Sequence, residues 1–119
     1  MGDMTHDFSR SEFRCRCGCG LDAIDPDLVD NLQHSRDAVG LPFVIHSGIR
    51  CPAHNKSEGG EDNSAHLKGL AVDILCPNSA ARYAMLFDFI RRFRRVGIGA
   101  TFIHVDIDPN LPSGVVWLY

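Results

Sequence analysis

The segment SAHLKGLAVD, residues 64–73, carries two side chains that can bind a metal ion. His66 and Asp73 lie on either side of a glycine, and Asp73 falls within an apolar run. Burying an isolated ionised carboxylate costs far more free energy than a small domain gains by folding. Asp73 therefore requires a positively charged partner.

A second segment, FIHVDID at residues 102–108, supplies further metal-binding side chains. Apolar and polar residues alternate along it, so that His104 and Asp106 share one face of a predicted strand. If this strand pairs with the strand that contains Asp73, then Asp73 and His104 converge, and His66 completes the set.

Two histidines and one carboxylate with an open fourth position are the donor set of a hydrolytic zinc site. Zinc lowers the pKa of a bound water to about 7, which makes the water a nucleophile at neutral pH. The charge of the metal would also let Asp73 stay ionised within an apolar strand. Three of the four histidines outside the two segments are interpreted as hydrogen-bonded core or surface residues: His6, His34 and His54.

The elements that must position these residues follow from capping and periodicity. Asp25 and Pro26 predict the start of a helix that ends before Gly40, and the stretch Pro77-Asn78-Ser79 caps a second helix that Gly97 closes. Predicted strands cover residues 42–47, 70–76, 98–107 and 115–119. Residues 48–69 have no periodicity, and we expect a functional loop there. Short connections favour an α+β domain, a small antiparallel sheet with the helices packed on one side.

Length and charge limit the possible functions. A chain of 119 residues is expected to form one domain. Its 12 basic and 15 acidic residues indicate no nucleic-acid surface, and the arginines at 91, 92, 94 and 95 are interpreted as a solvated helix face. No apolar stretch reaches about 18 residues, so we expect no membrane span. We also expect the chain to be a monomer. The N-terminus lacks the pattern of an export signal, so we expect the chain to be cytoplasmic at synthesis.

Five cysteines are present, of which Cys15, Cys17 and Cys19 alternate and Cys51 and Cys76 stand apart. In an extended segment the alternating sulfurs would share a face and point inward near Cys51. The spacing differs from the C-x-x-C of zinc knuckles. It favours small buried groups, or a pair that oxidises, over a second metal site.

The motifs resemble a known family, the zinc D-alanyl-D-alanine carboxypeptidases of peptidoglycan, whose fold is shared with the Hedgehog signalling domain. The resemblance lies in residues 47–74, SGIRCPAHNKSEGGEDNSAHLKGLAVDI, in FIHVDID, and in the opening DFSRSEFRCRCGCG, and thus covers nearly the whole chain. The pattern S-x-H-x-x-G-x-A-x-D is its most specific part. The resemblance implies that His66, Asp73 and His104 bind one Zn²⁺.

The resemblance also suggests substrate-binding residues. Arg50 would receive a substrate carboxylate, because a guanidinium can hold it through two parallel hydrogen bonds. The alternative is an ion pair of Arg50 with an acidic residue of the loop: Glu58, Glu61 or Asp62. His46 can reach a cleft to bind substrate or an oxyanion, or it is a satisfied strand residue. Ser64 is expected to cap local backbone groups and to support His66.

The general base is harder to assign from the resemblance. Many relatives have an acidic residue three positions before the last histidine ligand, where this chain has Thr101. We nominate Asp106 to accept the proton of the water and to pass it to the leaving amine. In one alternative Asp106 only orients His104, and in another Asp106 binds the metal while His104 is the base.

The expected function is zinc-dependent hydrolysis of a peptide bond in peptidoglycan stem peptides. Carboxypeptidase and endopeptidase or endolysin action both remain open, and the site of action would be the bacterial cell wall. An alternative is a zinc-containing, non-catalytic module that binds cell wall or protein, as the use of the fold in signalling suggests. A third reading is a small adaptor whose histidines are structural.

Overall fold

The computed structural model describes residues 2–119. Three α-helices are present: α1 (Pro26–Val39), α2 (Pro52–Ser57) and α3 (Ser79–Arg92). Two 3-10 helices accompany them: η1 (Arg10–Phe13) and η2 (Ala65–Lys68). The strands are β1 (Ile45–Ser47), β2 (Ala71–Leu75), β3 (Arg95–Ile98), β4 (Phe102–Asp106) and β5 (Val115–Leu118). None of the helices within residues 2–119 is both long and apolar enough to cross a bilayer.

The five strands form one mixed sheet in the order β1-β2-β4-β3-β5. The pairs β1–β2, β2–β4 and β3–β4 are antiparallel, as predicted. The prediction of a wholly antiparallel sheet is wrong at one edge, because β5 runs parallel to β3. The chain leaves β4 and passes to the outer edge of β3, where the backbone N–H groups of Gly114 and Val115 donate to the carbonyl oxygen of Arg94.

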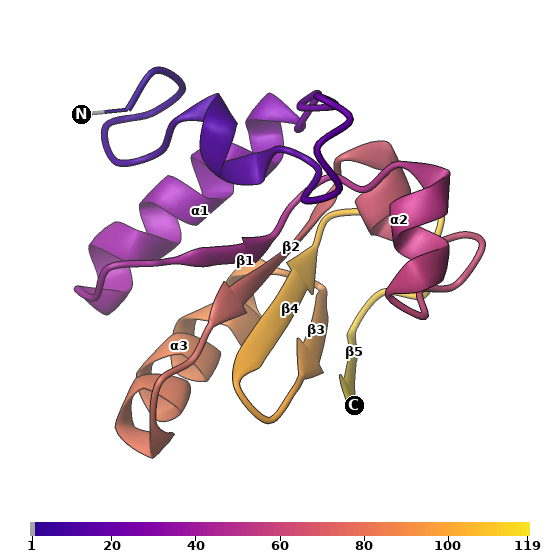
Figure 1. Ribbon diagram of the computed structural model, residues 1–119. Coiled ribbons are helices and arrows are strands. Elements are labelled where there is room, and N and C mark those ends of the chain that lie inside the picture. Colours follow the sequence, from indigo (N-terminus) through magenta and orange to yellow (C-terminus); the bar gives the residue numbers. More distant parts are fainter. Residues whose placement is uncertain (1) are drawn as a thin grey trace.

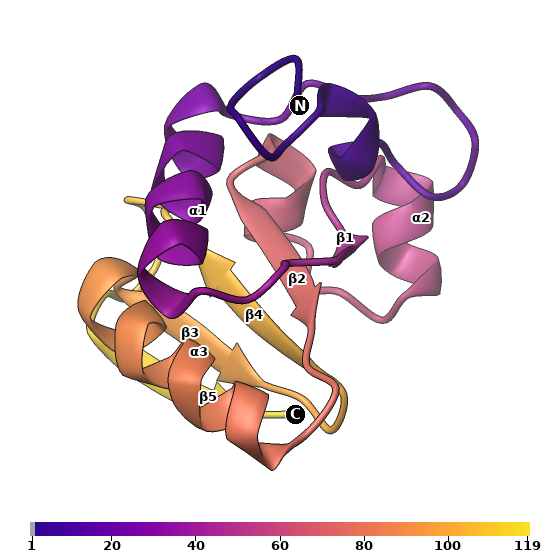
Figure 2. The same cartoon turned by 90° about the vertical axis from the view of Figure 1, so that its left-hand side faces the viewer.

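The sheet separates the hydrophobic core from a polar face. Alternate residues of β2 and β4 join the core, among them Val72, Ile74 and Ile103. Figure 1 shows α1 and α3 on one side of the sheet, and Figure 2, seen from that side, shows them in front of the strands. Since side chains alternate along a strand, the residues in between, including Asp73 and His104, point away from these two helices.

The first helix matches its prediction because its caps are local. The Asp25 side chain accepts hydrogen bonds from the N–H groups of Asp27 and Leu28, and Gly40 ends the helix in the left-handed region at φ 76°. The second long helix is shorter than predicted, since it ends at Arg92. Phe93 turns to an extended conformation and is buried, and Gly97 lies within β3.

Residues 48–69 are more ordered than the predicted loop. They contain α2, with Pro52 at its first position, and η2, capped by Ser64. The buried Asn55 donates from Nδ2 to the carbonyl oxygen of Glu61, which closes the intervening turn. Figure 1 shows α2 on the opposite side of β2 from α1. The two predicted helices thus pack on one side of the sheet as expected in an α+β domain, whereas α2, which was not predicted, lies on the other side.

The strand predictions were too long in two places. The predicted strand at 42–47 pairs only from Ile45 onward, and the predicted strand at 98–107 is divided between β3 and β4 by a turn. In this turn the N–H of Gly99 donates to the carbonyl oxygen of Phe102.

The alternating cysteines do not lie in an extended segment. Residues 14–20 form turns, with Gly18 at φ 87° and Gly20 at φ 89°. Cys15 is buried, whereas Cys17 and Cys19 are exposed. The prediction that all three point inward as small buried groups is wrong, although their sulfurs do gather near Cys51.

Candidate metal centre

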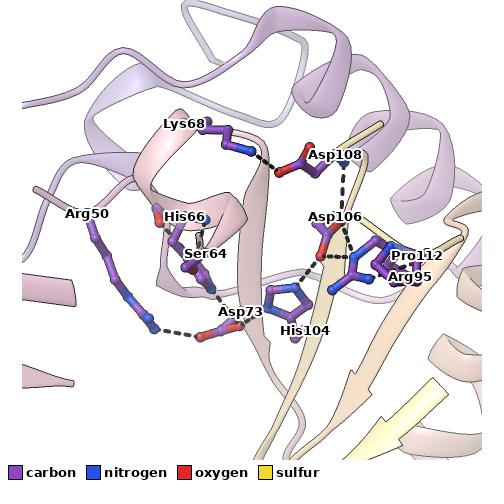
Figure 3. A network of polar contacts seen from close by, with 11 residues as sticks. Arg50, Ser64, His66, Lys68, Asp73, Arg95, His104, Asp106, Asp108 and Pro112 are labelled. Carbon is purple, nitrogen blue, oxygen red and sulfur yellow. Dashed lines mark hydrogen bonds and ion pairs between the residues drawn. The ribbon is translucent and has the colours of Figure 1, made fainter. Parts of the chain in front are cut away.

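Strand register brings Asp73 and His104 face to face. The two residues are direct partners in the β2–β4 pair, and Nδ1 of His104 lies 3.0 Å from Oδ1 of Asp73. His66 approaches from η2, with Nε2 at 3.3 Å from the same oxygen. Figure 3 shows both imidazoles pointing toward this carboxylate. The structure thus brings together all three predicted ligands.

The conformation of η2 holds His66 in place. Ser64 Oγ accepts a hydrogen bond from the N–H of His66, as expected, and Gly69 ends the turn at φ 70°. A Cβ atom at Gly69 would lie 2.5 Å from the carbonyl oxygen of Ala23, so a larger residue would displace the turn. The glycine of the segment is therefore needed for the position of His66.

The donor set fits a zinc ion. One donor atom from each of His66, Asp73 and His104 lies within 4.8 Å of the other two, and all three residues are buried. Nδ1 of His66 donates to the carbonyl oxygen of Gly48 over 2.7 Å, which leaves the lone pair of Nε2 directed toward Asp73. A hydrogen bond of this kind fixes the tautomer of metal-binding histidines.

The charges of the three residues are strongly coupled. Burial alone would raise the pKa of Asp73, but hydrogen bonds from His104 and His66 outweigh burial and hold it well below its usual value. Burial alone would lower the pKa of His104, but its hydrogen bonds to Asp106 and Asp73 raise it. Without a metal, the site thus favours an ionised Asp73 beside a protonated His104.

Arg50 is a second positive partner of Asp73. Its Nη2 lies 3.2 Å from Oδ2, and its Nε donates to Oγ of Ser47 over 3.1 Å. Within residues 2–119, Arg50 forms no ion pair with the acidic residues considered as its alternative partners, Glu58, Glu61 and Asp62. The guanidinium therefore lies at the candidate metal centre.

Asp106 lies on the far side of His104 from Asp73. Its Oδ2 accepts from Nε2 of His104 over 2.7 Å, and both of its oxygens lie within 3.0 Å of Nε of Arg95. Oδ1 also accepts from the N–H of Asp108. Burial would raise the pKa of Asp106, but the hydrogen bond and charge of His104 and the charge of Arg95 hold it below its usual value.

Sequence reasoning missed Arg95, which it assigned to a solvated helix face. The residue belongs to β3, directly opposite Asp106 in the β3–β4 pair, and its guanidinium carbon lies 4.9 Å from the centre of the Trp117 ring. The Trp117 ring in turn lies 5.2 Å from the ring of His104. The available signal for a strand rather than a helix was the pair of β-branched residues that follows Arg95, namely Val96 and Ile98.

A chain of polar contacts extends from the candidate ligands toward the surface. Nζ of Lys68 lies 2.7 Å from Oδ2 of the buried Asp108, whose N–H contacts Asp106 (Figure 3). Neither Lys68 nor Asp108 was predicted as a site residue. Their contacts restrain Asp106 from the side opposite to His104.

An open cleft of about 930 Å³ borders the three candidate ligands. His46, Arg50 and Ser64 contribute to its lining, as do Glu58 and Glu61. His46 is exposed and stacks on Phe102 at a ring distance of 6.3 Å. The lining does not include Thr101, nor the histidines interpreted as unrelated to the site: His6, His34 and His54.

Comparison with known proteins identifies the family of this chain. The model of the Peptidase M15 family matches residues 6–106, which include all three candidate ligands and Arg50. No curated protein matches the chain. The match covers most of the 119 residues. The chain therefore belongs to the Peptidase M15 family, that of the zinc D-alanyl-D-alanine carboxypeptidases which its sequence motifs resemble.

Proposed function

We propose that this chain is a zinc peptidase that hydrolyses a peptide bond in the stem peptides of bacterial peptidoglycan. The observation that carries the proposal is the convergence of His66, Asp73 and His104 beside an open cleft. Membership of a peptidase family gives that convergence its chemical context. A zinc ion held there would polarise the scissile carbonyl and activate a water molecule.

Arg50 is proposed to bind a carboxylate of the substrate. Its side chain lines the cleft and lies beside the candidate ligands, so a carboxylate held by its guanidinium would place the neighbouring amide near them. Three protein groups already orient the guanidinium: Ser47, Asn55 and Asp73. A side chain that is oriented before binding loses less entropy when the substrate arrives.

Asp106 is proposed to orient His104 rather than to act as the general base. It accepts from Nε2, the ring nitrogen opposite to the one that faces Asp73, and both of its oxygens are engaged by neighbouring donors. A carboxylate that accepts from the outer nitrogen of a ligand histidine fixes the ring and increases its basicity. This geometry favours the orienting alternative over the nominated base.

Proton transfer then falls to another group in the cleft. Glu58 and Glu61 carry the other carboxylates of the lining, and both belong to the segment between α2 and η2. Neither stands at the position of Thr101, where many relatives have an acidic residue. His46 lies in β1, which pairs with β2, and its exposed side chain contributes to the lining of the cleft. It is proposed to contact the substrate.

Digestion of purified peptidoglycan tests the proposal. New free amino groups should form, a chelator should stop their formation, and added Zn²⁺ should restore it. Mass spectrometry of the muropeptides would distinguish release of a terminal residue by a carboxypeptidase from cleavage of cross-links by an endopeptidase. Binding to peptidoglycan without new amino groups would instead support the non-catalytic module.

Action at the cell wall and a monomeric state are part of the same proposal. Cell-wall action follows from the substrate class and is tested by the same digestion. The monomer is tested by size-exclusion chromatography with light scattering, in which a mass near 13.2 kDa is expected.

A further inference from the structure

Four cysteines converge at a place separate from the His66, Asp73 and His104 set. Cys15, Cys17 and Cys19 lie in the turns that follow η1, and Cys51 lies directly before α2. One sulfur from each lies within 4.8 Å of the other three. We call this group the four-cysteine cluster.

The sulfur positions match those of a tetrahedral metal site. Zinc binds thiolates at about 2.3 Å, so neighbouring sulfurs around one tetrahedral zinc are about 3.8 Å apart. Sγ of Cys17 lies 3.5 Å from Sγ of Cys15 and 3.6 Å from Sγ of Cys51. All four cysteines are free thiols.

Backbone groups around the cluster favour thiolates. The N–H of Cys51 donates to Sγ of Cys15 over 3.4 Å, and the N–H of His54 donates to Sγ of Cys51 over 3.4 Å. Hydrogen bonds from backbone N–H groups to sulfur partly neutralise the negative charge of a thiolate cluster. The four-cysteine cluster therefore has outer contacts as well as ligands.

The turn that carries three of the sulfurs is built to present them together. The N–H of Cys15 donates to the carbonyl oxygen of Leu21 over 2.8 Å, which closes a loop around Cys17 and Cys19. The left-handed conformations of Gly18 and Gly20 allow the chain to reverse between the cysteines. Hydrophobic burial does not explain the loop, because Cys17 and Cys19 are exposed.

We propose that the four-cysteine cluster binds a second Zn²⁺ as a structural site. Four thiolates fill the tetrahedral coordination of zinc and leave no open position, which is the composition of structural rather than catalytic zinc sites. Binding would release the remaining thiol protons to solvent. The C-x-C-x-C spacing argued against a metal site in the sequence. In the structure, Cys51 adds a fourth sulfur to these three cysteines and would be the fourth ligand.

Such a site would anchor the substrate-binding side of the cleft. Cys51 follows Arg50 directly, and the N–H of Arg50 donates to the carbonyl oxygen of His66 over 3.0 Å. A metal between Cys51 and the turn at Cys15 would hold this stretch of backbone from the other side. The structural zinc would thus help to hold Arg50 and His66 in their positions relative to each other.

A disulfide is the competing fate of these cysteines. It would join two of the sulfurs and leave the other two without a role, whereas the four sulfurs are gathered together. A disulfide would also require an oxidising environment. The two alternatives predict different metal contents and different numbers of reactive thiols, so they can be separated by measurement.

The test is zinc stoichiometry of the full chain purified under reducing conditions. The unmodified protein should carry two zinc ions per chain, and the double variant Cys17→Ser/Cys19→Ser should carry one. The double variant His66→Ala/His104→Ala should also carry one, which separates failure of this proposal from failure of the proposed peptidase site. Cys76→Ser, a matched control outside the cluster, should retain two.

Cobalt substitution gives a readout that does not depend on activity or on the folding of a cysteine variant. In the His66→Ala/His104→Ala variant, Co²⁺ bound by four thiolates should show intense sulfur-to-metal charge-transfer absorption and the visible bands of a tetrahedral ion. Zinc added in excess should bleach both. Circular dichroism should show that the cysteine variant is folded before its zinc content is compared.

Three results would overturn the proposal. One is an unchanged zinc content in the folded Cys17→Ser/Cys19→Ser variant. Another is a histidine variant that binds no zinc while all cluster thiols react freely with a thiol reagent or are found in a disulfide. The third is iron rather than zinc as the metal that copurifies with the cluster.

Discussion

Arg50 donates from Nη2 to Oδ2 of Asp73 over 3.2 Å, while Oδ1 of the same carboxylate faces Nδ1 of His104 at 3.0 Å. The two oxygens of Asp73 therefore have different partners. One oxygen is available to a metal together with the two histidines, and the other is held by a guanidinium that lines the cleft. In the proposed function, this division would let one buried carboxylate connect zinc binding with substrate binding.

Replacing Asp73 tests the metal centre. Asp73→Asn keeps the shape of the side chain but removes its charge. Loss of a hydrogen-bond partner of a ligand weakens metal binding by about 10–100-fold. Loss of the charge of a ligand should weaken zinc binding at this centre by more than that. Competition with a chromophoric chelator measures the affinity. Asp62→Asn, in the exposed loop, is the matched control and should bind zinc normally. Equal zinc affinity in the two variants would remove Asp73 from the ligand set.

Replacing Arg50 tests the carboxylate-binding role. Arg50→Lys keeps the charge but loses the planar fork, so KM should rise or kcat should fall, with kcat/KM lower by about 10-fold or more. Zinc content should stay unchanged, because Arg50 is not a ligand. Arg91→Lys, on the exposed side of α3, is the control. Unchanged turnover of Arg50→Lys would withdraw the assignment.

Replacing Asp106 distinguishes an orienting residue from a general base. If Asp106 orients His104, then Asp106→Asn should weaken zinc binding by about 10–100-fold, and activity should largely return when zinc is saturating. If Asp106 is the base, zinc affinity should hardly change while kcat falls at every zinc concentration. Glu58→Gln and Glu61→Gln, measured in parallel, would show whether either residue transfers the proton.

A contact far from the site gives a prediction for stability. Asp88 on α3 accepts from Oγ of the fully buried Ser35 on α1 and from Nε of Arg92. Asp88→Asn should lower the free energy of unfolding by about 1.5 kcal/mol, the lower end for a hydrogen bond to a charged group. Urea denaturation at pH 7 measures this, and Asp30→Asn on the exposed face of α1 should change it by less than about 0.5 kcal/mol.

The same contact predicts a dependence on pH. Burial would raise the pKa of Asp88, but hydrogen bonds from Arg92 and Ser35 outweigh burial and lower it below its usual value of 3.8. Because the folded pKa is the lower one, the stabilisation is fully present above pH 3.8 and is lost as pH falls through the folded pKa. The stability difference between the unmodified protein and Asp88→Asn should therefore shrink below pH 3.8. A difference that grows on acidification would contradict the assignment.

Local patterns were sufficient where a local cause sets the structure. Asp25, Pro26 and Gly40 defined α1 correctly, because a cap is made by residues adjacent in the chain. The alternation around His104 and the apolar run around Asp73 predicted two strands whose polar residues share a face, and the structure pairs them directly. Asp73 and His104 could be named from the sequence for this reason, whereas His66, which lies in η2, was added from its place at the end of the loop and from the family resemblance.

The tertiary structure decided what depends on contacts between distant segments. Arg95 faces Asp106, β5 runs parallel to β3, and Cys51 joins the turn at Cys15, and in each case the partners are separated by many residues. Periodicity reports which side of an element a residue occupies, but not which other element lies there. The sequence by itself determined the donor types and their faces, whereas strand pairing and contacts between loops decided which donors meet.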